Sequence, residues 1–244
     1  MKAYELIKET FLRKTYIRIV HISWLAIYVF IFIIPSSPET WNWGPFLFAW
    51  SGCFLPLMIS AGIFGDDIAT GRISILITKP LWLGELYIYR LIGISLQAFL
   101  HLVISGCLIL ILHGITGRGN IKNLGLWTLL SWLIFNTWAA LSTSFSVVVK
   151  RGNNSMLLFV AIVFTCLLTR YLVTSLPDHT VTLVFRIVLK YTCPPIELLV
   201  NFANGKYSLI QNLGCVLYSL VLTMLYGIAG IIILSKRQFI CIRD

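Results

Sequence analysis

The sequence has 244 residues, of which 58% are hydrophobic and 11% are charged, and its mean hydropathy is +0.89. Soluble domains carry roughly 25% charged residues, so this composition excludes a water-soluble fold. The length suits one membrane domain of about six spans at roughly 20 residues each. We therefore expect residues 1–244 to form a single transmembrane domain, without a second soluble domain.

The net charge of +10 raises the question of a nucleic-acid partner. The basic residues lie beside apolar runs, however, as the cytoplasmic ends of membrane helices require, and we expect no nucleic acid to bind. Cysteines do not indicate a disulfide framework either, because four of the six lie inside apolar runs, at Cys53, Cys107, Cys166 and Cys215. We interpret them as small core residues.

Residues 1–15 have the pattern of an amphipathic helix. Tyr4, Ile7, Phe11 and Leu12 fall on one helical face, and the charged residues fall largely elsewhere. This arrangement predicts a helix that lies at the membrane interface and leads into the first span. A solvated cytoplasmic tail is the alternative interpretation.

Six apolar runs are each long enough to cross the hydrocarbon as a helix. They cover residues 17–34, 46–64, 91–112, 124–149, 156–172 and 213–234. None contains Asp or Glu, and their basic residues, Arg18 and Arg170, lie near an end from which a long side chain reaches the interface. The predicted fold is therefore all-α, a polytopic membrane protein with six transmembrane helices.

Basic residues set the predicted orientation in the cell membrane. With both termini in the cytoplasm, most of the 19 basic residues fall on the cytoplasmic side, as the positive-inside rule requires. The cytoplasmic set is Lys2, Lys8, Arg13, Lys14, Arg18, Arg72, Lys79, Arg90, Lys150, Arg151, Lys236, Arg237 and Arg243. We therefore expect a multi-pass protein of the cell membrane.

The segment 175–212, between the last two runs, is too long for a simple turn. Its apolar pieces, 181–189 and 196–202, are too short to cross a bilayer. They predict short re-entrant or surface helices before the last span, on the external side.

Sequence motifs for catalysis are missing. The glycine-rich stretch 114–119 lacks the Lys-Ser/Thr ending of a phosphate loop, and the four histidines have no metal-ligand spacing. The spans also lack the carboxylates that mark ion relays. We expect no catalytic residue, no metal and no cofactor in this chain, and an energy source in another chain.

The cytoplasmic stretch 65–90 mixes charged residues with apolar ones. A connection this apolar must lie on the membrane surface or dock onto a partner. Pro80 can end one helix and begin another, because the first residue of a helix needs no N–H partner.

This stretch carries a family resemblance. The acidic pair Asp66-Asp67 is followed by Gly-Arg-Ile-Ser-x-Leu-Ile-x-Lys-Pro and then by Glu-Leu-Tyr-x-x-Arg-Leu-Ile-Gly. The pattern resembles the ABC-2 type transporter permeases, which are membrane subunits of ATP-binding cassette exporters. The hydropathy of the whole chain is also similar to that family, although Ile73 stands where Thr-Leu is commoner.

The resemblance implies a permease subunit, not an enzyme, that forms the substrate pathway of an exporter. It implies two separate ATPase subunits that bind ATP and Mg, and a second permease chain, identical or related, in contact with membrane lipid. The residues that it assigns to coupling with the ATPase are Asp66, Asp67, Gly71, Arg72, Pro80, Leu81, Trp82, Leu83 and Glu85.

Two other classes of function stay open at this point. A membrane-embedded enzyme acting on lipid would need a cluster of His, Asp or Glu at the interface, which the isolated pair Asp66-Asp67 does not supply. A scaffold or immunity protein would bind a peptide or lipid without transporting it.

Overall fold

The computed structural model describes residues 3–12, 44–77, 82–116, 124–167, 183–184 and 208–236. Its helices are α1 (Ala3–Phe11), α3 (Gly44–Ile59), α4 (Ile63–Ala69), α5 (Arg72–Ile77), α6 (Leu83–Thr116), α7 (Leu124–Ser146), α8 (Arg151–Leu167) and α12 (Leu209–Lys236). The predicted all-α class is confirmed for this part of the chain. The predicted first span and most of the segment 175–212 lie outside the described residues.

Four helical stretches of the described chain are long and apolar enough to cross a membrane. They are Ser51–Ala69, Leu83–Ile115, Leu124–Ser146 and Ile210–Lys236. A shorter apolar helix covers Gly152–Phe164 and overlaps the fifth predicted span, 156–172. These lengths and compositions are those of a membrane protein.

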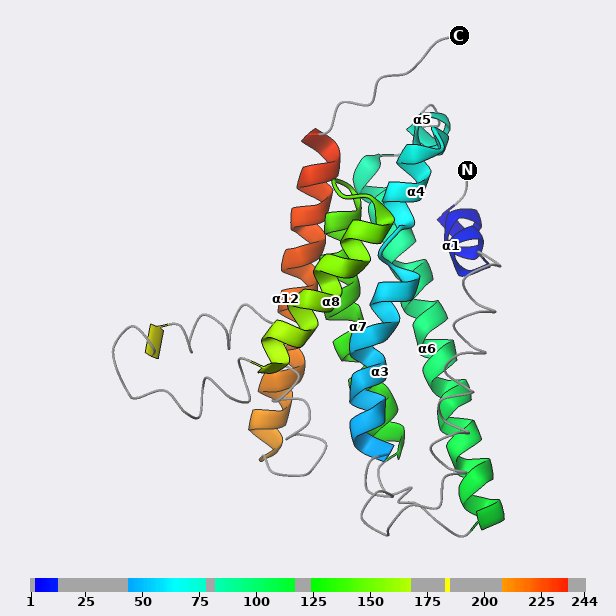
Figure 1. Ribbon diagram of the computed structural model, residues 1–244, viewed down its shortest axis with the longest axis vertical. Coiled ribbons are helices and arrows are strands. Elements are labelled where there is room, and N and C mark those ends of the chain that lie inside the picture. The colour runs from blue at the N-terminus through cyan, green and yellow to red at the C-terminus, as the bar shows by residue number, and fades with distance from the viewer. Residues whose placement is uncertain are drawn as a thin grey trace.

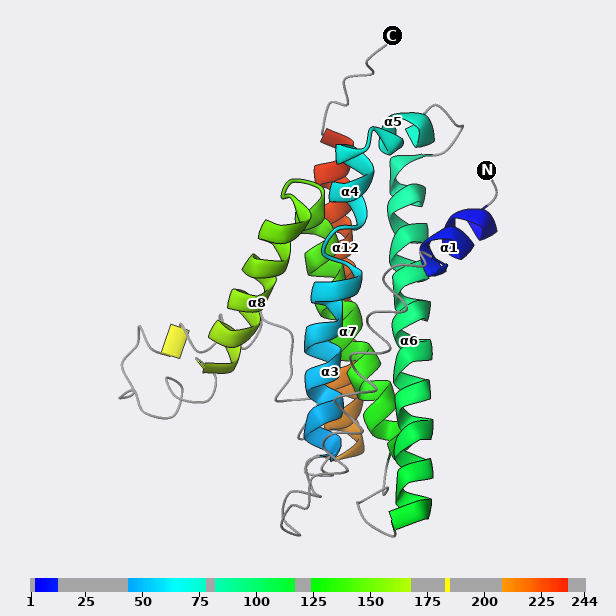
Figure 2. The same ribbon diagram turned by 45° about the vertical axis from the view of Figure 1, so that its right-hand side comes forward.

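Helices α3, α6, α7 and α12 run alongside one another for most of the length of the molecule (Figure 1). Of these, α7 has the most extensive contacts with the other three, so it is the centre of the bundle. Large side chains of α7, including Phe135 and Trp138, are fully buried there. Helix α8 leans away from the bundle, and α1 lies obliquely against α6 (Figure 2).

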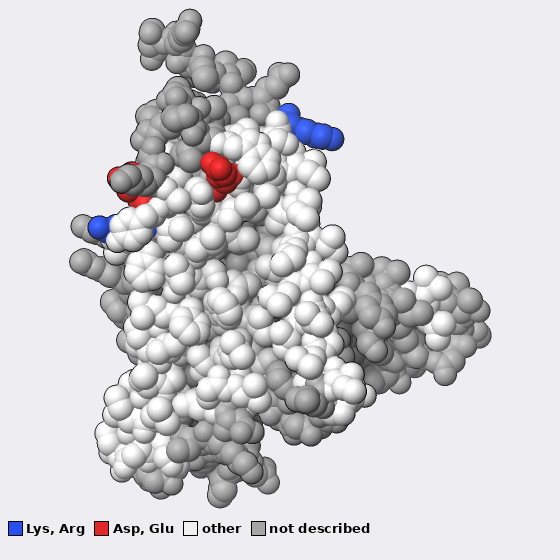
Figure 3. Space-filling view, turned by 180° about the vertical axis from the view of Figure 1, so that it is seen from behind, with Lys and Arg blue, Asp and Glu red and all other residues white. Residues whose placement is uncertain are grey.

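Charged residues gather at one end of the described bundle. Helix α6 has 34 residues, which is about 51 Å at 1.5 Å per residue and exceeds a hydrocarbon core of roughly 30 Å. The described Asp, Glu, Lys and Arg residues lie at the end where α6 begins and α12 ends, here called the charged end: Glu5, Lys8, Glu9, Asp66, Asp67, Arg72, Glu85, Arg90, Lys150, Arg151 and Lys236. Figure 3 shows charged side chains near that end of one face and an uncharged middle.

Glycines bring the bundle helices into close contact. A Cβ added to Gly52 of α3 would collide with the carbonyl oxygen of Ser131 in α7 and would lie 3.1 Å from Cβ of Ile134. A Cβ on Gly230 of α12 would collide with the hydroxyl of Tyr87 in α6. Such close approach is how apolar helices gain packing energy where no water has to be displaced.

We predict that Gly52→Ala lowers the free energy of unfolding by about 1–3 kcal/mol, because the colliding group is a backbone oxygen that cannot rotate away. Gly125→Ala in α7 is the control, since nothing lies within 4 Å of a Cβ added there. Thermal unfolding in detergent measures both variants. Equal stability of the two would contradict the close contact of α3 with α7.

Candidate functional site: a buried charge network at the charged end

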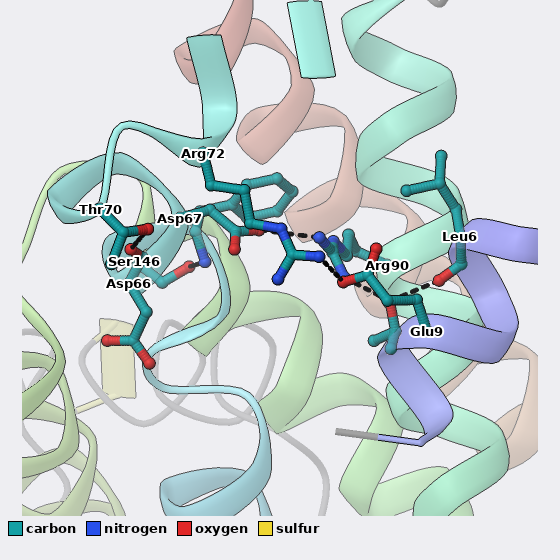
Figure 4. Close-up of polar contacts among 10 residues, drawn as sticks. Leu6, Glu9, Asp66, Asp67, Thr70, Arg72, Arg90 and Ser146 are labelled. Atoms are coloured by element: carbon teal, nitrogen blue, oxygen red, sulfur yellow. Dashed lines mark hydrogen bonds and ion pairs between the residues drawn. The ribbon is translucent and has the colours of Figure 1, made fainter. Parts of the chain in front are cut away.

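Arg90, in the second turn of α6, is the centre of the site. Its side chain is 0% exposed. One guanidinium nitrogen donates to Oε1 of Glu9 at 3.0 Å and to Oγ1 of Thr10 at 2.8 Å, both on α1. The other terminal nitrogen donates to Oδ2 of Asp67 on α4 at 3.0 Å. One side chain therefore joins three helices (Figure 4).

The charges of this network balance. Arg72, at the start of α5, forms a second ion pair with Oε1 of Glu9 at 2.8 Å, so two arginines meet the carboxylates of Glu9 and Asp67. An unpaired charge in a buried position costs several kcal/mol. Balanced pairing, with hydrogen bonds to each partner, is what makes the burial of Arg90 tolerable.

Thr10 fixes α1 against α6. Its hydroxyl donates to the carbonyl oxygen of Leu6 at 2.8 Å and accepts a hydrogen bond from Arg90. A Cβ added to Gly93, one turn beyond Arg90, would lie 2.6 Å from Cβ of Thr10. The missing side chain at Gly93 thus makes room for α1.

The face of α1 that packs against α6 is not the apolar face that was predicted to lie on the membrane. The structure buries Leu6 and Thr10 against α6, whereas Tyr4 and Leu12 are exposed. The difference follows from Arg90, because a small residue with a hydroxyl satisfies the guanidinium, and a larger apolar residue would not. The exposed apolar side chains are left free to contact other surroundings.

Tyr87 links the network to the centre of the bundle. Its ring stacks on Phe64 of α4, with centroids 5.4 Å apart and an interplanar angle of 6°. Its hydroxyl lies 3.0 Å from Oγ of Ser144 and donates to the carbonyl oxygen of Ala140 at 3.3 Å, both on α7. Helix α4 is therefore held against α6 by a ring contact as well as an ion pair.

The structure brings together part of the predicted coupling set. Asp67 and Arg72 both belong to the network, through Arg90 and Glu9 respectively. The side chain of Asp66 points to the other side of α4 (Figure 4). Its backbone carbonyl oxygen accepts a hydrogen bond from Oγ1 of Thr70, one turn further along, at 2.7 Å. Asp67, buried against Arg90, faces the interior of the chain.

The remaining predicted residues lie at or near the start of α6. Leu83 and Glu85 form its first turn, continuous with the long helix, while Pro80 and Leu81 lie outside the described residues. Trp82 is 64% exposed just before the helix. Gly71 has a φ of 67°, which glycine adopts without strain, and it separates α4 from α5.

The sequence-based set did not include Glu9 or Arg90. Arg90 belongs to the motif that carries the family resemblance, but its partner on α1 is 81 residues away in the sequence. Two features of the sequence indicated a possible pair: Arg90 lies at the edge of an apolar run, and Glu9 lies on a helix expected at the same membrane surface. Neither feature identifies Glu9 as the partner of Arg90.

No family model matches this chain, and no curated protein sequence matches it. The described helices define its class as that of a helical membrane protein. Among the described residues, no group of three or more His, Cys, Asp or Glu side chains is placed to hold a metal ion.

We predict that Arg90→Met lowers the free energy of unfolding by about 3–5 kcal/mol, because it leaves the carboxylate of Asp67 buried without its arginine partner. Thermal unfolding in detergent measures the loss. Limited proteolysis near α1 measures whether the helix comes away from α6.

Arg72→Met is the matched control. The Arg72 side chain is 45% exposed and also pairs with Glu9, and exposed pairs contribute about 0–1 kcal/mol. A loss of stability as large in Arg72→Met as in Arg90→Met would show that burial is not what makes Arg90 important.

Proposed function

We propose that this chain is the transmembrane permease subunit of an ATP-binding cassette exporter. The observation that carries the proposal is the exposed Trp82, which stands at the start of α6 eight residues before the buried Arg90. An aromatic side chain of this kind is a typical anchor in a protein interface. The network around Arg90, on the same helix, would transmit a movement of this residue to α1 and α4.

In this proposal two ATPase subunits, with ATP and Mg, act on the region around Trp82 and Glu85. A push on the first turn of α6 reaches Arg90 within the same helix, and from there α4 through Asp67 and α1 through Glu9. Three helices then respond together, as in rigid-body transitions driven from an interface. A second permease chain would complete the substrate pathway.

Membrane placement is part of the proposal. Tyr4 is 69% exposed on α1, and the ammonium of Lys8 lies 5.9 Å from the centre of its ring. Aromatic and basic side chains together are typical of a helix at the bilayer interface. We propose six spans in the cell membrane, with α1 on the lipid surface and the charged end, and both termini, in the cytoplasm.

Trp82→Ala is predicted to reduce the amount of ATPase that co-purifies with the chain. Truncation of an interface anchor costs about 2 kcal/mol or more, roughly a 30-fold loss of affinity. Ile115→Ala is the control, because Ile115 is 76% exposed at the opposite end of the same helix. Unchanged ATPase binding and transport in Trp82→Ala would rule out this contact. A parent chain that co-purifies with no ATPase and supports no transport would instead favour a scaffold that transports nothing.

Cysteine labelling tests the orientation. Asn153 is exposed at the charged end and Gly125 is exposed at the opposite end of the bundle. With an impermeant reagent, we expect Gly125→Cys to react in intact cells and Asn153→Cys to react only after permeabilisation. The reverse pattern would place the charged end outside the cell.

A further inference from the structure

The second of the six predicted spans, residues 46–64, is interrupted between α3 and α4. Helix α3 ends at Ile59 and α4 begins at Ile63, so residues 60–62 form a break inside one apolar run. Pro56 lies inside α3 one turn earlier, but proline disturbs the helical turn that precedes it and does not account for a break that follows it. The amide of Ser60 and its hydroxyl both donate to the carbonyl oxygen of Pro56, at 3.0 and 2.8 Å.

Side chains from the start of α8 hold this break. Nδ2 of Asn154 donates to the carbonyl oxygen of Ala61 at 2.7 Å and to that of Ser142 in α7 at 2.9 Å. The hydroxyl of Ser155 donates to the carbonyl oxygen of Leu57 in α3 at 3.1 Å. Asn154 is fully buried. Irregular backbone at membrane depth requires partners of this kind.

Helix α7 supports the first turn beyond the break. The hydroxyl of Ser146 accepts from the amide of Phe64 at 3.4 Å and donates to the carbonyl oxygen of Thr143 at 2.7 Å, and Figure 4 shows Ser146 beside α4. The break is therefore fixed to α7, at the centre of the bundle, and to the start of α8. The bond to Phe64 is the longest of these contacts.

The far end of α4 is held differently. Asp67 binds Arg90 of α6 at 3.0 Å, and beyond Gly71 the chain turns into α5, whose first residue, Arg72, pairs with Glu9. Helices α4 and α5 are thus a short arm, with neutral hydrogen bonds at its base and ion pairs at its tip. The base lies in the bundle, and the tip lies at the charged end.

We propose that residues 60–62 are a pivot at which the arm of α4 and α5 moves relative to α3 and α7, that Asn154 positions this pivot, and that the pair of Asp67 with Arg90 latches the arm. The two kinds of contact suit these roles. The ion pair of the latch is broken when one of its charges is lost. The neutral hydrogen bonds of Asn154 do not depend on charge and keep the base in place while the arm moves. The use of this movement in coupling rests on the proposed function. The movement itself does not.

Distances between spin labels test the movement on the purified chain in detergent, with the native cysteines replaced. One label pair joins the arm to the bundle, at Ala69→Cys and Leu129→Cys, both exposed positions. The control pair joins α7 to α12, at Leu129→Cys and Ile232→Cys. The parent chain should give one narrow distance distribution for each pair.

Asp67→Asn removes the charge of the latch but keeps an oxygen that can accept a hydrogen bond from Arg90, which also stays paired with Glu9, so the fold should persist at reduced stability. We expect a second distance population for the Ala69–Leu129 pair and no change for the Leu129–Ile232 pair. Asn154→Ala should broaden the first pair alone, because the pivot loses its position. A residue with a purely structural role would lower the unfolding temperature and alter both pairs alike.

Three results would overturn the inference: an unchanged Ala69–Leu129 distance in Asp67→Asn, an unchanged one in Asn154→Ala, or equal broadening of the control pair. All three are read without an ATPase. If the distances refute the pivot, the proposed function is still decided by co-purification of the ATPase with Trp82 variants. If that co-purification refutes the proposed function, the distances still test the pivot.

Discussion

A buried guanidinium is the constraint on which the charged end depends. Arg90 has no exposed surface, so acceptors for its guanidinium have to come from neighbouring helices, here α1 and α4. Glu9 and Asp67 supply the two charges and Thr10 supplies a hydroxyl. This requirement explains why α1 turns a threonine toward α6, and why α4 turns a carboxylate inward at a position where an apolar residue would otherwise pack.

Hydroxyl groups on α7 join it to α12 by hydrogen bonds without any charged group. Thr137 lies 3.0 Å from the hydroxyl of Ser219 and 3.1 Å from that of Thr223, both on α12. The hydroxyl of Ser144 donates to the carbonyl oxygen of Tyr226 at 2.7 Å. Small polar residues let apolar helices approach closely and still bond to one another. Helix α7 therefore holds α12 with hydroxyls where α6 holds α4 with an ion pair.

Hydropathy predicted the positions of the long helices well, because a helix that crosses a membrane needs an apolar run about as long as the hydrocarbon core is thick. The runs 124–149 and 213–234 correspond to α7 and α12. The run 91–112 missed the first two turns of α6, which carry Glu85 and Arg90 and extend beyond the apolar stretch. The run 46–64 concealed the break after Ile59, since broken and continuous helices have the same hydropathy.

The partners of Arg90 depend on that concealed break. A continuous helix turns by about 100° per residue, so the face of α3 that packs against α7 would also dictate where Asp67 points. The interruption at residues 60–62 removes this constraint from α4, in which Asp67 faces Arg90. Sequence spacing predicts side-chain direction only within an unbroken helix. The network could therefore not be predicted without the break. The break could not be predicted without the position of Asn154, which bonds to Ala61 across 93 residues of sequence.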